Sequence, residues 1–194
     1  MYYFSFNFEF VPAVQAFCKK KLESIKAAPT PQRQANVLFA SDLPSDVCAT
    51  INNELSYYKL PQLFALHLFT RPPFFTQNWH KDLYSMKDGR VFGKSTAYNI
   101  PIEGCVDCFM EWAEGEVIEI KRPDPGYGHT HPEWVKGPFI VDRLCFERPH
   151  FVKVDSFHRA STGPKERTIA SLRFQENLSF EDYFSSISKQ KGIM

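Results

Sequence analysis

Hydrophobic and polar residues alternate at the start of the chain. Aromatic side chains occupy every second position from Tyr2 to Phe10, and most of the residues between them are polar. A period of two predicts a half-buried strand over residues 2–10. The spacing then changes, because the apolar residues of 12–27 fall on one face of a helix and a run of lysines on the other. This second pattern predicts an amphipathic helix.

A second helix is predicted over Ser45–Tyr57, where apolar residues recur every four positions. Asp42 or Ser45 can cap its first turn, because short side chains with an oxygen accept hydrogen bonds from the free backbone N–H groups there. The residues from 175 to the end are mostly polar. They predict a tail with a single amphipathic turn at 180–184.

From residue 61 onward the chain reads as short strands separated by turns. Residues 63–69 are almost continuously apolar, which is typical of a buried strand. Further strands are predicted at 97–102, 106–112, 116–121, 139–146, 151–154 and 168–174. Gly104, Gly115 and a Pro/Gly-rich loop over 123–137 are the expected breaks. Many short strands at this spacing predict a sandwich, a barrel or a jelly roll.

We therefore expect an α+β chain that is mainly β, with 1–194 forming one domain. Residues 1–60 would supply a strand and two supporting helices, 61–175 the β core, and 176–194 a tail. A chain of 194 residues is long enough to bury a hydrophobic core of its own.

Composition narrows the classes of function. There are 23 Lys and Arg against 22 Asp and Glu, so the net charge of +1 argues against a general attraction to nucleic acid. We find no apolar run long enough to span a membrane and no signal peptide, so no membrane partner is expected. Five cysteines, an odd number in a chain that does not need disulfides, favour reduced thiols and a cytoplasmic location.

The segment Asn78-Trp79-His80-Lys81-Asp82 carries the main candidate chemistry. In an extended backbone, residues i and i+2 point to the same side, so an imidazole and a carboxylate can meet there. His158, which follows a predicted strand, is the best third ligand. Two histidines and one carboxylate form the facial triad of non-haem Fe(II) oxygenases, which leaves coordination positions open for a co-substrate and O₂.

A second group of candidate residues lies on the last predicted strand, which begins near Arg167. With a period of two, Arg167, Ile169, Ser171 and Arg173 share one face of it. An arginine on a buried strand is costly unless it is paired. A dicarboxylate ligand would supply the partner, since the planar guanidinium binds a carboxylate through two N–H groups.

The ordered set of His80-x-Asp82, His158 and Arg167 resembles the 2-oxoglutarate and Fe(II)-dependent oxygenase superfamily. The stretch HRASTGPKERTIASLRF is especially similar to the C-terminal motif of that family. The resemblance implies a double-stranded β-helix (jelly roll, cupin-like) with N-terminal helices packed on it. It also implies that O₂ and 2-oxoglutarate are consumed, that succinate and CO₂ are released, and that an unidentified substrate is hydroxylated.

The resemblance also assigns residues. His80, Asp82 and His158 would bind Fe(II), and Arg167 would bind the far carboxylate of 2-oxoglutarate. The interval of nine residues from His158 to Arg167 is slightly short for the family. Arg173, six residues further on the same face, is therefore an alternative anchor. Ser171 and Asn99 are further candidate polar groups of the co-substrate pocket.

Two other classes of protein stay open from the sequence. One is a non-catalytic β-barrel binding module, and the other is a cupin-type metalloenzyme that does not use 2-oxoglutarate. Neither class needs a buried arginine to bind a dicarboxylate, so Arg167 and Arg173 distinguish them from an oxygenase. The primary substrate and the oligomeric state are not predicted.

Overall fold

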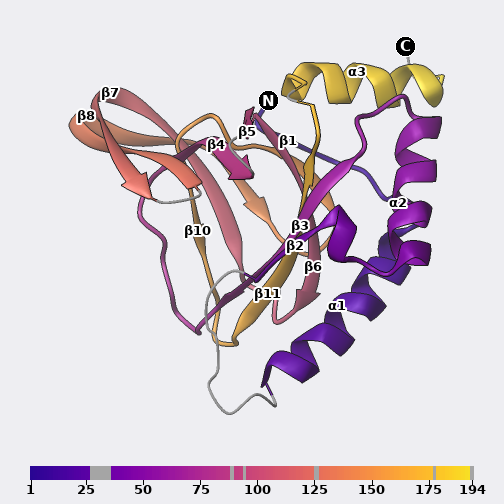
Figure 1. The fold of residues 1–194 in the computed structure, drawn as a ribbon. Helices are drawn as coiled ribbons and strands as arrows, with labels where there is room; N and C mark the ends of the chain where they lie inside the picture. Colours follow the sequence, from indigo (N-terminus) through magenta and orange to yellow (C-terminus); the bar gives the residue numbers. More distant parts are fainter. Residues whose placement is uncertain (27–35, 88–89, 94, 125–126, 177, 193–194) are drawn as a thin grey trace.

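Two antiparallel sheets form the body of the protein (Figure 1). The computed structural model spans residues 1–194 and describes the chain except for 27–35, 88–89, 94, 125–126, 177 and 193–194. The six-stranded sheet has the order β1 (Tyr3–Ser5), β9 (His150–Lys153), β6 (Thr96–Glu103), β11 (Arg167–Phe174), β3 (Leu63–Arg71) and β2 (Asn36–Phe39). The five-stranded sheet has the order β10 (His158–Ser161), β7 (Phe109–Asp124), β8 (Tyr127–Cys145), β4 (Lys81–Lys87) and β5 (Arg90–Gly93).

From β3 onward, successive strands alternate between the two sheets, except in the β4–β5 and β7–β8 hairpins, whereas β1, β2 and β3 all lie in the six-stranded sheet. This alternation is the winding of a double-stranded β-helix of the jelly-roll type. Three helices accompany it: α1 (Val11–Lys26), α2 (Ser45–Tyr57) and α3 (Phe180–Gln190). The predicted fold class, mainly β with N-terminal helices packed on a jelly roll, is confirmed.

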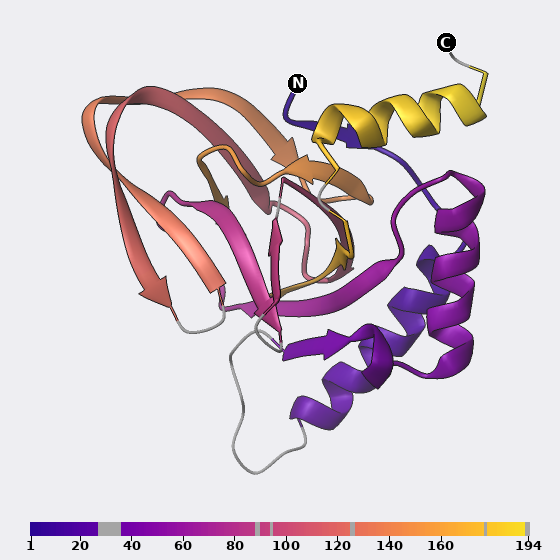
Figure 2. The same cartoon turned by 45° about the horizontal axis from the view of Figure 1, so that its top comes forward.

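The six-stranded sheet separates two hydrophobic cores. The three helices lie on its outer side, as the two views show (Figures 1 and 2), and bury Leu55, Phe151 and Leu172 there. Trp112 and Phe146 belong to the second core, which lies between the sheets. Strand β11 is buried along its whole length because both of its faces are covered.

The N-terminal strand is shorter than predicted. Only Tyr3–Ser5 pair with β9, yet Phe6, Phe8 and Phe10 are still buried and the residues between them are exposed. These rings pack against each other, with 4.6 Å between the centroids of Phe6 and Phe8 and between those of Phe8 and Phe10. The alternation of aromatic and polar residues at 2–10 therefore arises from burial of the rings under the helices as well as from strand pairing.

Helix α1 begins at Val11 and ends at Lys26, so each of its ends lies one residue earlier than in the helix predicted over 12–27. Helix α2 has the predicted span. The predicted cap of α2 is wrong, since Pro44 stands at its N-cap position and no side chain caps it. Asp42 instead accepts a hydrogen bond from the backbone N–H of Phe39 in a short 3₁₀ turn, η1 (Ala40–Asp42). The tail prediction is also wrong, because α3 is a helix of 11 residues that begins with a Ser179 cap.

The β7–β8 hairpin overturns two further predictions. Of the strand predicted at 106–112, only 109–112 belong to β7, since 106–108 form the turn before it. The strand predicted at 116–121 is also part of β7, and most of the predicted loop at 123–137 is β-structure. Gly115 does not end the strand, since the register shifts around it as in a β-bulge. A Cβ atom there would lie 2.4 Å from the carbonyl oxygen of Lys136 and 2.8 Å from the Trp134 ring, so the partner strand requires glycine.

Four strands were not predicted: β2, β4, β5 and β10. Each is short or rich in polar residues, so its sequence lacks the apolar run or alternation that marks a strand. Strand β10 supplies His158, and β4 supplies Asp82. No helix in the described part of the chain has the length and apolarity needed to cross a membrane.

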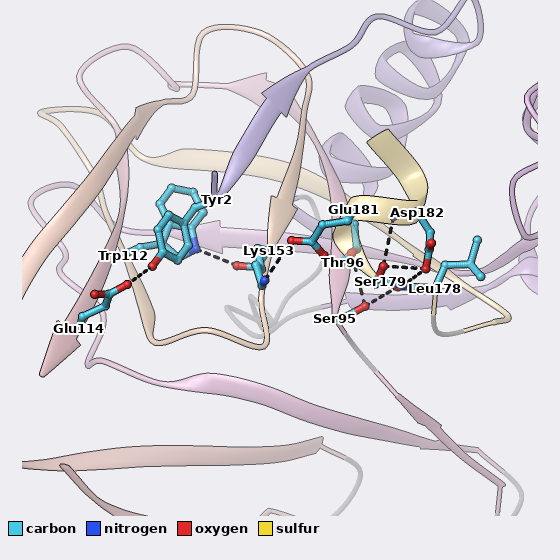
Figure 3. A network of polar contacts seen from close by, with 10 residues as sticks. All are labelled: Tyr2, Ser95, Thr96, Trp112, Glu114, Lys153, Leu178, Ser179, Glu181 and Asp182. Atoms are coloured by element: carbon cyan, nitrogen blue, oxygen red, sulfur yellow. Dashed lines mark hydrogen bonds and ion pairs between the residues drawn. The ribbon is translucent and has the colours of Figure 1, made fainter. Parts of the chain in front are cut away.

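Polar contacts attach α3 to the jelly roll (Figure 3). The indole N–H of Trp112 donates to the carbonyl oxygen of Lys153 at 2.7 Å, and the Lys153 ammonium contacts Glu181 at 3.3 Å. The Ser95 hydroxyl donates to the carbonyl oxygen of Leu178 at 2.5 Å. These contacts link β7, β9 and Ser95, the residue before β6, to the C-terminal helix α3 and the segment before it.

His150 gives the fold a testable pH dependence. Its ring is 2% exposed, its Nδ1–H donates to the carbonyl oxygen of Arg148, and it meets Tyr3 edge-on. Burial lowers the pKa of His150 from 6.5 to about 4. The unfolded chain therefore binds this proton first as the pH falls below 6.5, so stability falls between pH 6.5 and about 4.

We expect His150→Phe to remove this part of the pH dependence. In the wild type, His150 should account for about 3 kcal/mol of lost unfolding free energy over that interval. Urea unfolding of both proteins at pH 7, 5.5 and 4.5 gives the comparison. The variant's stability should fall less steeply than the wild type's. Parallel curves would show that His150 is not held neutral by the fold.

Candidate metal centre and ligand cavity

A backbone bridge brings the two candidate histidine ligands together. The N–H of His80 donates to the carbonyl oxygen of His158 at 3.0 Å, and the N–H of His158 donates back at 2.8 Å. Residues paired in this way point their side chains to the same face. The ring centroids of the two histidines lie 4.3 Å apart. Residues 78 positions apart in the chain are thus neighbours through backbone geometry alone.

Asp82 completes the cluster. It lies two residues after His80 on the same side, and its N–H donates to the carbonyl oxygen of Val154 at 2.8 Å. One ligand atom from each of His80, Asp82 and His158 can be chosen so that all three lie within 4.8 Å of one another. All three side chains are buried. The structure therefore places the three predicted residues around one point.

Hydrogen bonds orient both imidazoles. Nδ1 of His80 lies 2.9 Å from the carbonyl oxygen of Asn78, and Nδ1 of His158 lies 2.9 Å from that of Ser156. A carbonyl only accepts, so each Nδ1 carries the proton and each Nε2 keeps a lone pair. Support of this kind from a second layer of groups is typical of metal-binding histidines. The amide nitrogen of Gln77 lies 3.3 Å from Nε2 of His80.

Arg173 faces the same cluster from β11. Its Nη2 lies 3.2 Å from Oδ2 of Asp82, and both side chains are buried. The other carboxylate oxygen, Oδ1, lies 3.9 Å from Nε2 of His80. One oxygen of Asp82 therefore meets the guanidinium while the other faces the histidines.

A cavity of about 210 Å³ opens from this cluster between the two sheets. The odd-numbered residues of β11, from Arg167 to Arg173, line it together with side chains of β3, β6 and β10. Phe69, Met110, Phe146 and Ile169 supply apolar wall. A cavity with a mostly apolar wall and a few convergent polar groups is typical of a small-molecule site.

Arg167 lies in this cavity, six residues along β11 from Arg173. It is 3% exposed, and its Nε and Nη1 have no hydrogen-bond partner in the described structure. The guanidinium lies over the Phe146 ring, 5.2 Å from its centroid. Burial lowers the pKa of Arg167, as does the neighbouring Arg71. A buried cation with free donors calls for an anion that the described residues do not provide.

Asn99 and Ser171 are register partners on β6 and β11 and line the cavity between the two arginines of β11. Oδ1 of Asn99 and Oγ of Ser171 are buried and make no hydrogen bond within the described structure. They offer an acceptor and a hydroxyl to a ligand. The four predicted co-substrate residues thus line the same cavity as the triad.

Three polar residues of this cavity are not among the predicted site residues: His67, Arg71 and Gln77. His67 and Arg71 reach it because β3 pairs with β11, which sets His67 opposite Ser171 and Arg71 opposite Arg167. The alternation of His67, Phe69 and Arg71 on a buried strand was the available signal. Gln77 has no such signal, since it precedes β4 in a segment without regular structure.

The Cys-x-x-Cys sequence at Cys105 and Cys108 forms no metal cluster among the described residues. Both thiols are free and buried. Burial raises the pKa of Cys105 to about 11, so its thiol stays neutral.

The donor set fits a divalent iron. Two neutral imidazoles and one carboxylate on a single side are the ligands of the facial triad. Their burial and the oriented lone pairs of His80 and His158 match what such a centre needs. Arg167, with free donors in the same cavity, fits a dicarboxylate chelate of that metal.

Comparison with known proteins gives limited similarity. No protein-family model and no curated protein matches the chain. Among solved structures, it is similar to the viral collagen prolyl hydroxylase of Paramecium bursaria Chlorella virus-1 in its 2-oxoglutarate complex. The sequences are 11% identical, 92% of this chain and 97% of that chain are covered, and the TM-score is 0.41. A truncated form of that hydroxylase gives 9% identity, coverage of 90% and 91%, and a TM-score of 0.31. The TM-scores are low, so the function of this chain is inferred from its own residues.

The Arg173–Asp82 contact makes a prediction about stability. Arg173→Met should leave the buried Asp82 carboxylate without this cation and lower the unfolding free energy of the metal-free protein by about 3 kcal/mol. A bound divalent metal would compensate the carboxylate, so the loss should shrink when Mn(II) is present. Urea unfolding with and without Mn(II) measures both values.

Lys153→Met is the matched control, because it breaks the Lys153–Glu181 pair, whose glutamate is exposed. It should cost less than about 1 kcal/mol, with or without metal. If Arg173→Met cost no more than this control in the metal-free protein, the buried pair would not be what holds Asp82 in place.

Proposed function

We propose that the protein is a non-haem Fe(II)- and 2-oxoglutarate-dependent oxygenase that hydroxylates an organic substrate, and that it releases succinate and CO₂. One observation carries the proposal. The oriented, buried triad of His80, Asp82 and His158 shares a cavity with Arg167, a buried guanidinium whose Nε and Nη1 have no hydrogen-bond partner among the described residues. When bound, the iron would supply the activation of O₂ that drives both the decarboxylation and the hydroxylation.

The protein's own groups then have separate tasks. His80 and His158 would bind the metal through Nε2, and Asp82 through Oδ1, while Arg173 holds the other oxygen of Asp82. Arg167 would bind the distal carboxylate of 2-oxoglutarate. Asn99 and Ser171 would bond to polar atoms of the co-substrate between these two ends. The apolar wall formed by Phe69, Met110 and Ile169 excludes water, which strengthens each of these polar contacts.

The same observation weighs against the other two classes. A binding module has no need for three oriented ligand groups around one point. A cupin-type metalloenzyme that does not use 2-oxoglutarate has no need for a buried arginine with free donors. The two classes and the oxygenase also differ in one spectroscopic property.

Anaerobic addition of Fe(II) and 2-oxoglutarate to the wild-type protein tests the proposal. An oxygenase should develop a weak visible charge-transfer band that requires both additions and disappears when air is admitted. A binding module would show no band, and a cupin-type enzyme would bind Fe(II) without it. Either result would reject the proposed function.

The variant His158→Ala should abolish succinate formation, because the metal would lose one of three protein ligands. Folding should change little, since His158 serves the cavity and not a hydrophobic core. Mn(II) titration followed by calorimetry should show weakened binding, and circular dichroism should show an unchanged fold. Turnover that persists in the variant would show that His158 is not a ligand.

The variant Arg167→Ala should weaken 2-oxoglutarate binding by about 2 kcal/mol, the size of a charge-assisted hydrogen bond. Its affinity for the metal should be retained, since Arg167 does not contact the triad residues in any described interaction. Calorimetric titration of the Mn(II)-loaded protein with 2-oxoglutarate measures this effect. If Arg173→Met weakens co-substrate binding and Arg167→Ala does not, the two arginines exchange roles.

A further inference from the structure

Arg71 brings a second cation to the Arg167 end of the cavity. Arg71 is the last residue of β3, Arg167 is the first residue of β11, and the two are direct register partners. Partners across an antiparallel pair project to the same face, and both arginines line the cavity. Like charges placed directly opposite each other in a sheet destabilise it. The arrangement therefore needs a compensating anion.

No such anion is found among the described residues that line the cavity. Asp82 is the only carboxylate in that lining, and one of its oxygens faces Arg173 while the other faces His80. Cys105 lies near Arg167, but burial raises the pKa of its thiol to about 11, so it stays neutral. The charges of Arg71 and Arg167 are left for a ligand to balance.

Arg71 is held in a defined position. Its Nη1 donates to the carbonyl oxygen of Thr70 at 3.1 Å. The guanidinium also lies 5.8 Å from the centroid of the Phe69 ring and 5.6 Å from that of the Phe75 ring. These contacts restrain the side chain without supplying a negative charge, and a restrained guanidinium loses less freedom when it binds a ligand.

We propose that Arg71 is a second binding residue for the distal carboxylate of 2-oxoglutarate, and that Arg71 and Arg167 together make the site selective for dicarboxylic 2-oxoacids. This inference rests on the proposed function. A carboxylate has about four lone-pair positions, and a single guanidinium fork fills only two of them. The second fork fills the others and balances the charge of the register pair.

Binding of two 2-oxoacids to the Mn(II)-loaded protein tests this proposal. Both 2-oxoglutarate and 2-oxobutyrate carry the 2-oxoacid head that would chelate the metal, but 2-oxobutyrate has no distal carboxylate. Calorimetry at one fixed ionic strength gives the two dissociation constants without turnover. The wild type should bind 2-oxoglutarate much more tightly than 2-oxobutyrate.

In Arg71→Ala, the dissociation constant for 2-oxoglutarate should rise by about tenfold or more, as expected for the loss of a charge-assisted hydrogen bond. The value for 2-oxobutyrate should change by less than about twofold, because the lost contact is absent from that complex. Arg71→Lys should fall between the wild type and Arg71→Ala, since a lysine keeps the charge and loses the planar fork.

Arg148→Ala is the matched control. It removes the same charge from an exposed position outside the cavity lining, so neither dissociation constant should change. Thermal unfolding of each variant verifies folding. Arg71→Gln replaces Arg71→Ala if the alanine variant does not fold.

The possible outcomes separate the two proposals. If the wild type binds 2-oxoglutarate and Arg71→Ala binds it equally well, the role of Arg71 is wrong and the proposed function stands. Equal weakening for both 2-oxoacids would also overturn it, since Arg71 would then support the cavity as a whole. If the wild type does not bind 2-oxoglutarate at all, the proposed function itself fails.

Discussion

A buried positive charge for which the described residues provide no anion is the constraint on which the account of this molecule depends. Placing the Arg167 guanidinium inside the jelly roll with free donors costs stability that no described side chain recovers. The sheet register adds Arg71 directly opposite, which increases the cost. Such an arrangement is understandable when a dianionic ligand completes it, and the adjacent His80, Asp82 and His158 cluster would hold the metal that binds the other end of that ligand.

The fold positions both halves of this site through backbone pairing. The bridge between His80 and His158 fixes the candidate metal ligands, and the pairing of β11 with β3 and β6 fixes the polar row of the cavity. The helices cover the opposite face of the same sheet, so β11 is buried on both sides. The site is therefore built on strands that are fixed by pairing and by packing on the opposite face, as a preorganised site requires.

Local periodicity explains how much of this could be predicted. The i, i+2 relation of His80 and Asp82 and the period of two along β11 depend only on extended backbone, so the sequence indicates which side chains share a face. The spans of α1 and α2 follow in the same way from helical spacing. The resemblance to a known family supported His158 as the third ligand and narrowed the expected fold from a sandwich, barrel or jelly roll to a double-stranded β-helix.

The remaining features depend on contacts between distant segments. Alternation along β3 puts Arg71 on the same face as His67, but its place opposite Arg167 depends on the register between β3 and β11, which no local pattern specifies. Strand β10 has four residues and is held by its neighbours, so its composition does not identify it. The β7–β8 hairpin contains prolines and glycines that normally mark loops, yet pairing between two long strands overrides that tendency.

A crystal structure of the protein grown with Mn(II) and 2-oxoglutarate tests the central claim most directly. The account predicts one metal ion bound by Nε2 of His80, Nε2 of His158 and the Asp82 carboxylate, with the distal carboxylate of 2-oxoglutarate against Arg167. A metal bound elsewhere, or a cavity in which Arg167 meets no anion while 2-oxoglutarate is in excess, would contradict it.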